Sequence, residues 1–259
     1  MNLASIGSGS KGNGTLVRSG DTIVLVDCGF TVKETCLRLA RLGLSPEDLS
    51  AVVVTHEHGD HIRGVLPLAR RYRLPVHMTF GTLRAISAPG SRHSLAGVTV
   101  QEVRPGRRFS VGTVEVLPVP VPHDALEPCQ YVFEAGTRRT GVLTDLGSVT
   151  PHVVEAYATC DALLLECNHD PELLARGPYP PSLKRRVGGA RGHLSNQQAG
   201  SLVTVLERNR LQHLVLSHLS EQNNTPEHAL EAVADAGFDD AQRVRVASQQ
   251  EGFGWLDVN

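Results

Sequence analysis

Four potential metal ligands, three histidines and Asp60, follow a short apolar run within the six consecutive positions His56-Glu57-His58-Gly59-Asp60-His61. The run itself, Ala51 to Val54, is short and β-branched, as is typical of a strand buried on both faces. Residues two apart in an extended segment point to the same side, so His56 and His58 can share one metal ion. Asp60 and His61 lie further along and can serve a second ion nearby. Imidazole suits zinc and iron, and carboxylate also tolerates manganese. The motif therefore predicts a metal site at the end of a buried strand.

The same plan of an apolar strand ending in polar residues occurs elsewhere in the chain. Thr22 to Val26 leads into Asp27, upstream of the histidine motif. In the second half, Gly141 to Thr144 leads into Asp145, and Ala162 to Leu165 leads into Glu166. An internal duplication would account for this loose repetition.

Strand and helix patterns alternate along the whole chain. Helices are expected over Lys33 to Leu42, Asn196 to Arg208 and Pro226 to Ala236, and strands with turn signals over Val98 to Val121. Central sheets with helices outside predict an α/β fold, a four-layer αββα sandwich. No Pro/Gly/Ser-rich linker divides the chain, so one domain is expected over residues 1–259. Pro171 to Gly192 is expected to be irregular.

Charge and cysteine content limit the class of protein. The chain has 25 Lys and Arg against 27 Asp and Glu, a formal net charge of −2, which excludes a globally basic nucleic-acid coat. Nucleic-acid binding would therefore require a local patch. No apolar run approaches the ~20 residues that cross a bilayer, and the first residues do not resemble a signal peptide. The five cysteines form no C-x-x-C pair. We therefore expect reduced thiols, no membrane association and a cytoplasmic location.

The motif His-x-His-x-Asp-His resembles that of the metallo-β-lactamase superfamily, and the resemblance extends over essentially the whole chain. It implies the αββα fold of that superfamily and two divalent metal ions per chain, with zinc, manganese and iron left open. The implied first site consists of His56, His58, His123 and Asp145. The implied second site consists of Asp60, His61, Asp145 and His218, so that Asp145 bridges the ions. The resemblance makes Asp27 the carboxylate that orients the metal loop from behind.

Further segments narrow the resemblance to one branch. The Gly/Ser-rich opening from Ile6 to Asn13, Glu166 with the residues after it, and Gly192-His193-Leu194-Ser195-Asn196 look most like the bacterial YycJ/WalJ family of metal-dependent DNA exonucleases. In related RNA-processing enzymes, an acid and a histidine at the places of Glu166 and His193 support protonation of the leaving oxygen. The catalytic residues implied are His193, Glu166 and Asp60.

The expected substrate is therefore nucleic acid, with DNA favoured over RNA, cleaved as a phosphodiester in the 5′-to-3′ direction. The residues expected to bind it are Lys184, Arg185, Arg186, Arg191, Ser8 and Asn13. A small-molecule hydrolase, either a cyclic phosphodiesterase or a thioesterase, is the alternative that uses the same metals. A non-catalytic protein on a retained fold would show eroded ligands, and all seven are present. The pattern predicts no oligomeric state.

Overall fold

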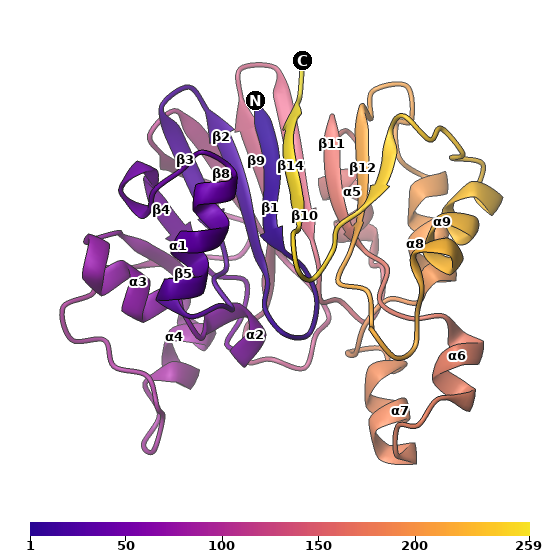
Figure 1. Ribbon diagram of the computed structural model, residues 1–259, viewed down its shortest axis with the longest axis horizontal. Helices are drawn as coiled ribbons and strands as arrows, with labels where there is room; N and C mark the ends of the chain where they lie inside the picture. The colour runs from indigo at the N-terminus through magenta and orange to yellow at the C-terminus, as the bar shows by residue number, and fades with distance from the viewer.

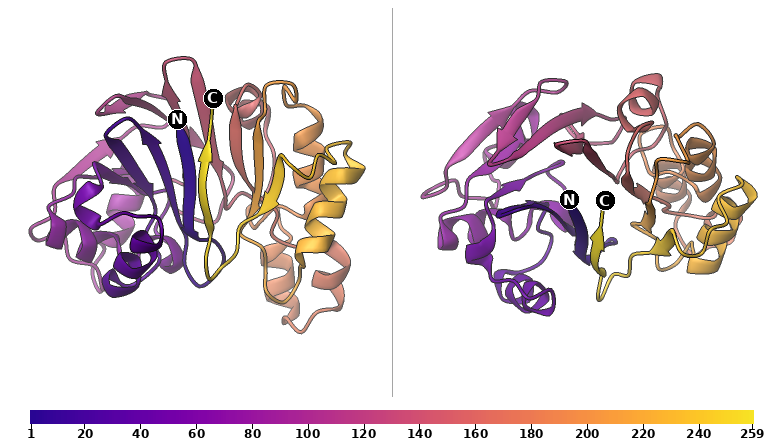
Figure 2. Two further views of the ribbon diagram at one scale, coloured as in Figure 1. Left: turned by 45° about the horizontal axis from the view of Figure 1, so that its top comes forward. Right: turned by 90° about the horizontal axis from the view of Figure 1, so that it is seen from above.

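Two seven-stranded sheets face each other in the computed structural model of the protein, which describes residues 1–259. Helices cover the outer face of each sheet, so the molecule has four layers, as seen from above in Figure 2. This arrangement confirms the αββα sandwich expected from the sequence. The single domain expected over residues 1–259 stays a prediction.

The first sheet has the strand order β14-β1-β2-β3-β4-β5-β6 and joins both ends of the chain (Figure 1). Strands β3 to β6 run parallel to one another, so their carboxyl ends lie at one edge. The strands are β1 (Asn2–Gly7), β2 (Gly14–Ser19), β3 (Thr22–Val26), β4 (Ala51–Val53), β5 (Val76–Thr79), β6 (Val100–Val103) and β14 (Phe253–Asp257).

The second sheet has the order β13-β12-β11-β10-β9-β8-β7. Its strands β10 to β13 are parallel and again place their carboxyl ends together. The strands are β7 (Phe109–Val111), β8 (Val114–Pro120), β9 (Cys129–Ala135), β10 (Arg138–Leu143), β11 (Ala162–Glu166), β12 (His213–Ser217) and β13 (Val244–Val246).

Helices form the outer layers, and two of them, α6 (Pro171–Arg176) and α7 (Pro181–Val187), form a projecting arm (Figure 1). Three pack on the first sheet, namely α1 (Val32–Arg41), α3 (Val65–Tyr72) and α4 (Phe80–Ile86). Three pack on the second, namely α5 (Pro151–Tyr157), α8 (Asn196–Thr204) and α9 (Pro226–Asp235). Like α6 and α7, the remaining helices are short: η1 (Pro46–Asp48) and α2 (Gly59–Ile62). None of the helices is long and apolar enough to cross a membrane.

Strand alternation explains why apolar runs form this sandwich. Val24 and Val26 point toward the opposite sheet, whereas Ile23 and Leu25 point toward the outer helices. Both faces of β3 are thus buried, which is why its sequence shows no polar alternation.

Two predictions about helices need correction. The stretch Pro171 to Gly192 was expected to be irregular, but it contains helices α6 and α7, each with a proline in its first turn. Proline is favoured there because the first-turn N–H has no helical partner to lose. The helix expected to reach Arg208 ends at Thr204.

Candidate metal centre

Five chain segments bring the predicted ligands and Asp27 to one end of the sandwich. Asp27 follows β3, and the histidine motif follows β4 and continues into α2. From the second sheet, His123 follows β8, Asp145 follows β10 and His218 follows β12. Carboxyl ends of parallel strands in open α/β sheets are the usual place for a ligand site. The residues that the sequence singles out as ligands therefore lie together, although their role as ligands stays a prediction.

Three of these residues have a left-handed backbone conformation. The φ angles are 61° at Asp27, 51° at Asp145 and 54° at His218, each just after a strand. A non-glycine residue in this region costs about 1–3 kcal/mol when it is strained, and such residues concentrate at functional sites. The conformation at His218 is held by its N–H, which donates to Ser8 Oγ at 2.9 Å. The sharp turn after each strand directs the side chain of this residue toward the centre.

One group of donors contains three histidines, His56, His58 and His123. Their rings lie 4.5 to 5.0 Å apart between centroids, each pair edge to face. His123 Nδ1 donates to the carbonyl of Gly192 at 2.9 Å, so Nε2 carries the lone pair. That Nε2 lies 3.3 Å from His58 Nδ1, and the two atoms converge on one point. This is the predicted first site, without its bridging carboxylate.

A second group contains Asp60, His61 and His218, with Asp145 between the two groups. His61 Nε2 lies 3.0 Å from Asp145 Oδ2 and 3.5 Å from Asp60 Oδ2. His218 Nε2 also lies 3.5 Å from Asp60 Oδ2. Asp145 is within ligand range of His56 as well as His61, which is the placement that a bridging carboxylate requires.

Asp27 fixes the ring orientation of two histidines from behind. Its Oδ1 accepts from the Thr55 N–H, and its Oδ2 accepts from the Thr55 hydroxyl, both at 2.8 Å. Oδ2 also lies 2.8 Å from His61 Nδ1, so this nitrogen is the protonated one. Because the Thr55 hydroxyl proton is engaged, its oxygen accepts from His56 Nδ1 at 2.9 Å. Both rings thereby present Nε2 lone pairs to the centre.

The chemistry of these donors fits a cation. His56 Nε2 is buried and has no hydrogen-bond partner. Burial and the neighbouring His61 hold the pKa of His56 well below its ordinary value, so the ring is a neutral donor. Burial would lower the pKa of His218, but the Asp145, Asp60 and Glu166 carboxylates raise it to about 10. The centre thus combines unpartnered neutral nitrogen with carboxylates that favour positive charge, and its clusters are able to bind metal.

Glu166 and His193 lie beside the donors. His193 Nδ1 is 2.7 Å from Glu166 Oε1 and 3.4 Å from Asp145 Oδ1. Glu166 is fully buried, whereas the His193 side chain keeps 21% of its surface exposed. Burial would lower the pKa of His193, but the Glu166 and Asp145 carboxylates raise it above its ordinary value. A protonated imidazole at an accessible position can serve as a proton donor.

The residues expected to bind substrate separate into two groups. Ser8 and Asn13 are only 4% and 6% exposed. The Ser8 hydroxyl accepts from His218 N–H, and Asn13 Nδ2 lies 3.0 Å from His61 Nε2. Both residues therefore contact candidate ligands, and their expected role in substrate binding stays a prediction.

The four basic residues differ in where they lie. Arg186 Nε pairs with Asp124 Oδ2 at 2.5 Å, next to the histidine group. Arg191 lines a groove of about 480 Å³ together with His123. Lys184 instead donates to the carbonyl of Ala175, on the α6 side of the arm. Arg185 has neither contact and lies on exposed α7.

Three contributors to the centre were missed in the sequence. Asp124 Oδ1 lies 3.4 Å from His123 Nε2 and 3.8 Å from His58 Nε2. Thr55 sets ring orientations, and Asn168 Nδ2 donates to the His218 carbonyl at 2.9 Å. Each is adjacent in sequence, or nearly so, to a predicted site residue, and that adjacency was the available signal.

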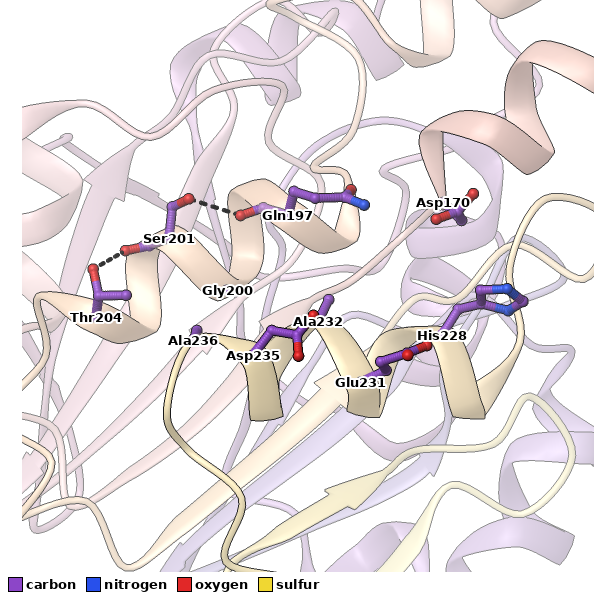
Figure 3. Close-up of a pocket in the computed structure, with 10 residues that line it drawn as sticks. All are labelled: Asp170, Gln197, Gly200, Ser201, Thr204, His228, Glu231, Ala232, Asp235 and Ala236. Atoms are coloured by element: carbon purple, nitrogen blue, oxygen red, sulfur yellow. Dashed lines mark hydrogen bonds between the residues drawn. The ribbon is translucent and has the colours of Figure 1, made fainter.

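A separate groove of about 320 Å³ lies between α8 and α9 (Figure 3). His228 and three carboxylates line it, those of Asp170, Glu231 and Asp235. None of the metal-centre donors reaches it, so it is distinct from the centre.

Comparison with known proteins gives consistent matches. Residues 22–219 match the family described as the β-lactamase superfamily domain. The chain is 33% identical over 237 residues to exodeoxyribonuclease YycJ of Bacillus anthracis, covering 90% of this chain and 88% of that protein. It is 33% identical over 224 residues to exodeoxyribonuclease WalJ of Streptococcus pneumoniae, covering 86% and 83%. The metallo-β-lactamase fold protein YhfI from Bacillus subtilis superimposes with a TM-score of 0.72 at 20% identity, covering 99% of both chains.

Proposed function

Since this chain belongs to the metallo-β-lactamase superfamily and is a metal-dependent hydrolase, we propose that it hydrolyses phosphodiester bonds in nucleic acid. Within that class we propose a DNA exonuclease acting in the 5′-to-3′ direction in the cytoplasm. The exodeoxyribonuclease names of the relatives from B. anthracis and S. pneumoniae support DNA as the substrate. The observation that carries the proposal is the Glu166–His193 pair at 2.7 Å beside the metal centre.

Two divalent ions, of zinc, manganese or iron, would be held by the two donor groups around Asp145. When bound, such ions supply Lewis acidity and a nucleophile at neutral pH. The chain's own task is to hold the imidazole rings in the correct orientation. Asp27 and Thr55 do so for His56 and His61, and the Gly192 carbonyl does so for His123.

His193 would act on the leaving group. An alkoxide leaves poorly from phosphorus, so cleavage of a phosphodiester benefits from protonation of the departing oxygen. The Glu166 carboxylate holds Nδ1 of His193, which leaves Nε2 as the nitrogen that can transfer a proton. Because the His193 side chain is partly exposed, a substrate oxygen can reach it.

Basic residues beside the centre would hold the sugar-phosphate chain. Both Arg186 and Arg191 lie next to the histidine group. Arg186 pairs with Asp124, and Arg191 lines the same groove as His123. Lys184 and Arg185 extend the positive charge along α7. Contacts of this kind are electrostatic and independent of base sequence.

The test is hydrolysis by protein loaded with zinc or manganese of end-labelled duplex DNA, single-stranded DNA and RNA. A generic phosphodiester and a thioester are assayed in parallel. We expect progressive release of mononucleotides from the 5′ end of DNA, with no release by His193→Ala. Turnover of the small substrates alone would contradict the proposal and favour the small-molecule hydrolase.

A further inference from the structure

Positive charge is concentrated in a part of the chain that the proposed site does not use. Between His61 and Gln101 there are six arginines and no acidic residue, in a chain whose net charge is −2. The arginines are Arg63, Arg70, Arg71, Arg73, Arg84 and Arg92. This segment comprises α3, β5, α4 and the loop that follows, and it begins directly after the metal loop.

Part of this segment encloses a groove of about 420 Å³. The residues that line it come from both ends of α2, from α3 and from the loop at Arg92 to Ser94. Arg63, Arg70 and Arg92 all line it, and no carboxylate does. A groove with three guanidinium groups and no acid is complementary to an anion.

One of the three arginines holds the groove in shape, and the other two have no ion-pair partner. Arg70 Nε donates to the Ala96 carbonyl, and its second guanidinium nitrogen donates to the Ser94 carbonyl, both at 2.7 Å. These two bonds hold the loop against α3. Arg63 and Arg92 have no carboxylate within ion-pairing distance. By contrast, Arg186, one of the residues expected to bind substrate, is already paired with Asp124.

The groove adjoins the metal centre through the backbone. Gly59 lines it, and the next two residues are the candidate ligands Asp60 and His61. Arg63 lies at the other end of the same short helix, α2. In Figure 1 the loop after α4 projects on the same lower side of the molecule as α6 and α7, with α2 between them. The metal centre thus has positive charge on both sides.

We propose that the Arg63–Arg70–Arg92 groove is a second phosphate-binding site, which holds the sugar-phosphate backbone of the nucleic acid where it passes away from the metal centre. This inference rests on the proposed nuclease function. Arg63 and Arg92 would each neutralise one phosphate through a charge-assisted hydrogen bond, and Arg70 would position the loop. The occupant is a polyanion, since a single small substrate held at the metals would not extend into this groove.

The test compares Arg63→Gln/Arg92→Gln with the wild-type protein, both loaded with metal. Binding of a fluorescein-labelled phosphorothioate DNA, which resists cleavage, is measured by anisotropy over a series of salt concentrations. We expect Kd to rise about tenfold or more at physiological salt. The slope of log K against log salt should fall by about 1.8, because two fewer phosphates are neutralised at about 0.9 each on duplex DNA. Metal content, thermal midpoint and turnover of bis-p-nitrophenyl phosphate should not change.

A matched control is Arg73→Gln, which removes one exposed arginine at the far end of α3 and outside the groove. It should leave Kd and the salt slope as in the wild type. An unchanged Kd and slope in the double variant would overturn the second site while leaving the nuclease proposal intact. A lost turnover of the small diester would show that the arginines shape the metal centre, which also overturns it. Failure of the wild type to bind DNA would overturn both proposals together.

Discussion

The Nδ1 atom of His193 lies 2.7 Å from Oε1 of Glu166, although the two residues are 27 positions apart in the chain. The second oxygen, Oε2, accepts hydrogen bonds from the backbone N–H of Leu146 at 2.9 Å and of Leu194 at 3.1 Å. One buried carboxylate therefore connects the loop after β10, which carries Asp145, with the segment that carries His193. This relationship places the exposed imidazole relative to the metal donors.

The first prediction concerns this pair. His193→Ala and Glu166→Gln should each lower kcat by about 10²–10⁴, the usual contribution of a positioned proton donor. The double variant should be little worse than the poorer single variant, because the two residues act as one unit. Metal content, measured on the purified proteins, should stay at the wild-type level in His193→Ala. His228→Ala, an exposed histidine away from the centre, is the control. Multiplying losses in the double variant would contradict the pairing.

Much of the placement of this centre could be predicted because the candidate ligands follow strands. Once the apolar runs before His56, Asp145 and His218 are taken as parallel strands, their polar successors must meet at one edge. The four layers follow from the same apolar runs, whereas the order of the strands within each sheet was not predicted. The contact of Ser8 with the His218 N–H could not be predicted, because the two residues lie 210 positions apart in the chain. The ion pair of Arg186 with Asp124 likewise depends on how α7 packs.

The second prediction concerns ring orientation. Oδ2 of Asp27 accepts from both the Thr55 hydroxyl and His61 Nδ1. Asp27→Asn keeps one carbonyl oxygen but puts an NH2 group, which cannot accept a hydrogen bond, in place of the other oxygen. We expect metal affinity to fall by about 10- to 100-fold, the usual effect of losing a group that orients a ligand. Competition with a chromophoric chelator measures this directly. Asp21→Asn, on an exposed turn, should bind metal as the wild type does. Equal affinity in Asp27→Asn would show that the rings are oriented by other contacts.

The third prediction concerns the close approach of two backbones. A Cβ added at Gly147 would lie 2.4 Å from the Gly192 nitrogen, directly before His193. Gly147→Ala should therefore displace the His193 segment and lower kcat by about 10-fold or more, since a shift of about 1 Å can cost 10²-fold. Metal affinity should fall as well, because the Gly192 carbonyl on the displaced segment accepts from Nδ1 of the candidate ligand His123. Gly254→Ala, where an added Cβ meets nothing within 4 Å, serves as the control. Wild-type turnover in Gly147→Ala would mean that the segment yields without cost.

The fourth prediction concerns His77, a buried histidine outside the metal centre, and its effect on the pH dependence of stability. His77 lies in β5, is 4% exposed and stacks on Phe109 with 4.7 Å between ring centroids. Burial lowers the pKa of His77 to about 4, from an ordinary value of 6.5. Between these values the unfolded chain binds a proton that the folded chain does not, so stability falls as pH drops through this window.

Urea unfolding at about pH 7.5 and pH 5 tests that prediction on wild type and His77→Phe. The phenylalanine keeps the stacking partner of Phe109 but cannot titrate. We expect the wild type to lose about 2 kcal/mol more than the variant between the two pH values. Titration of the other histidines affects both proteins alike, so the difference between them isolates His77. Parallel losses in the two proteins would show that His77 is protonated in the folded state at pH 5, and hence that water reaches its ring between the sheets.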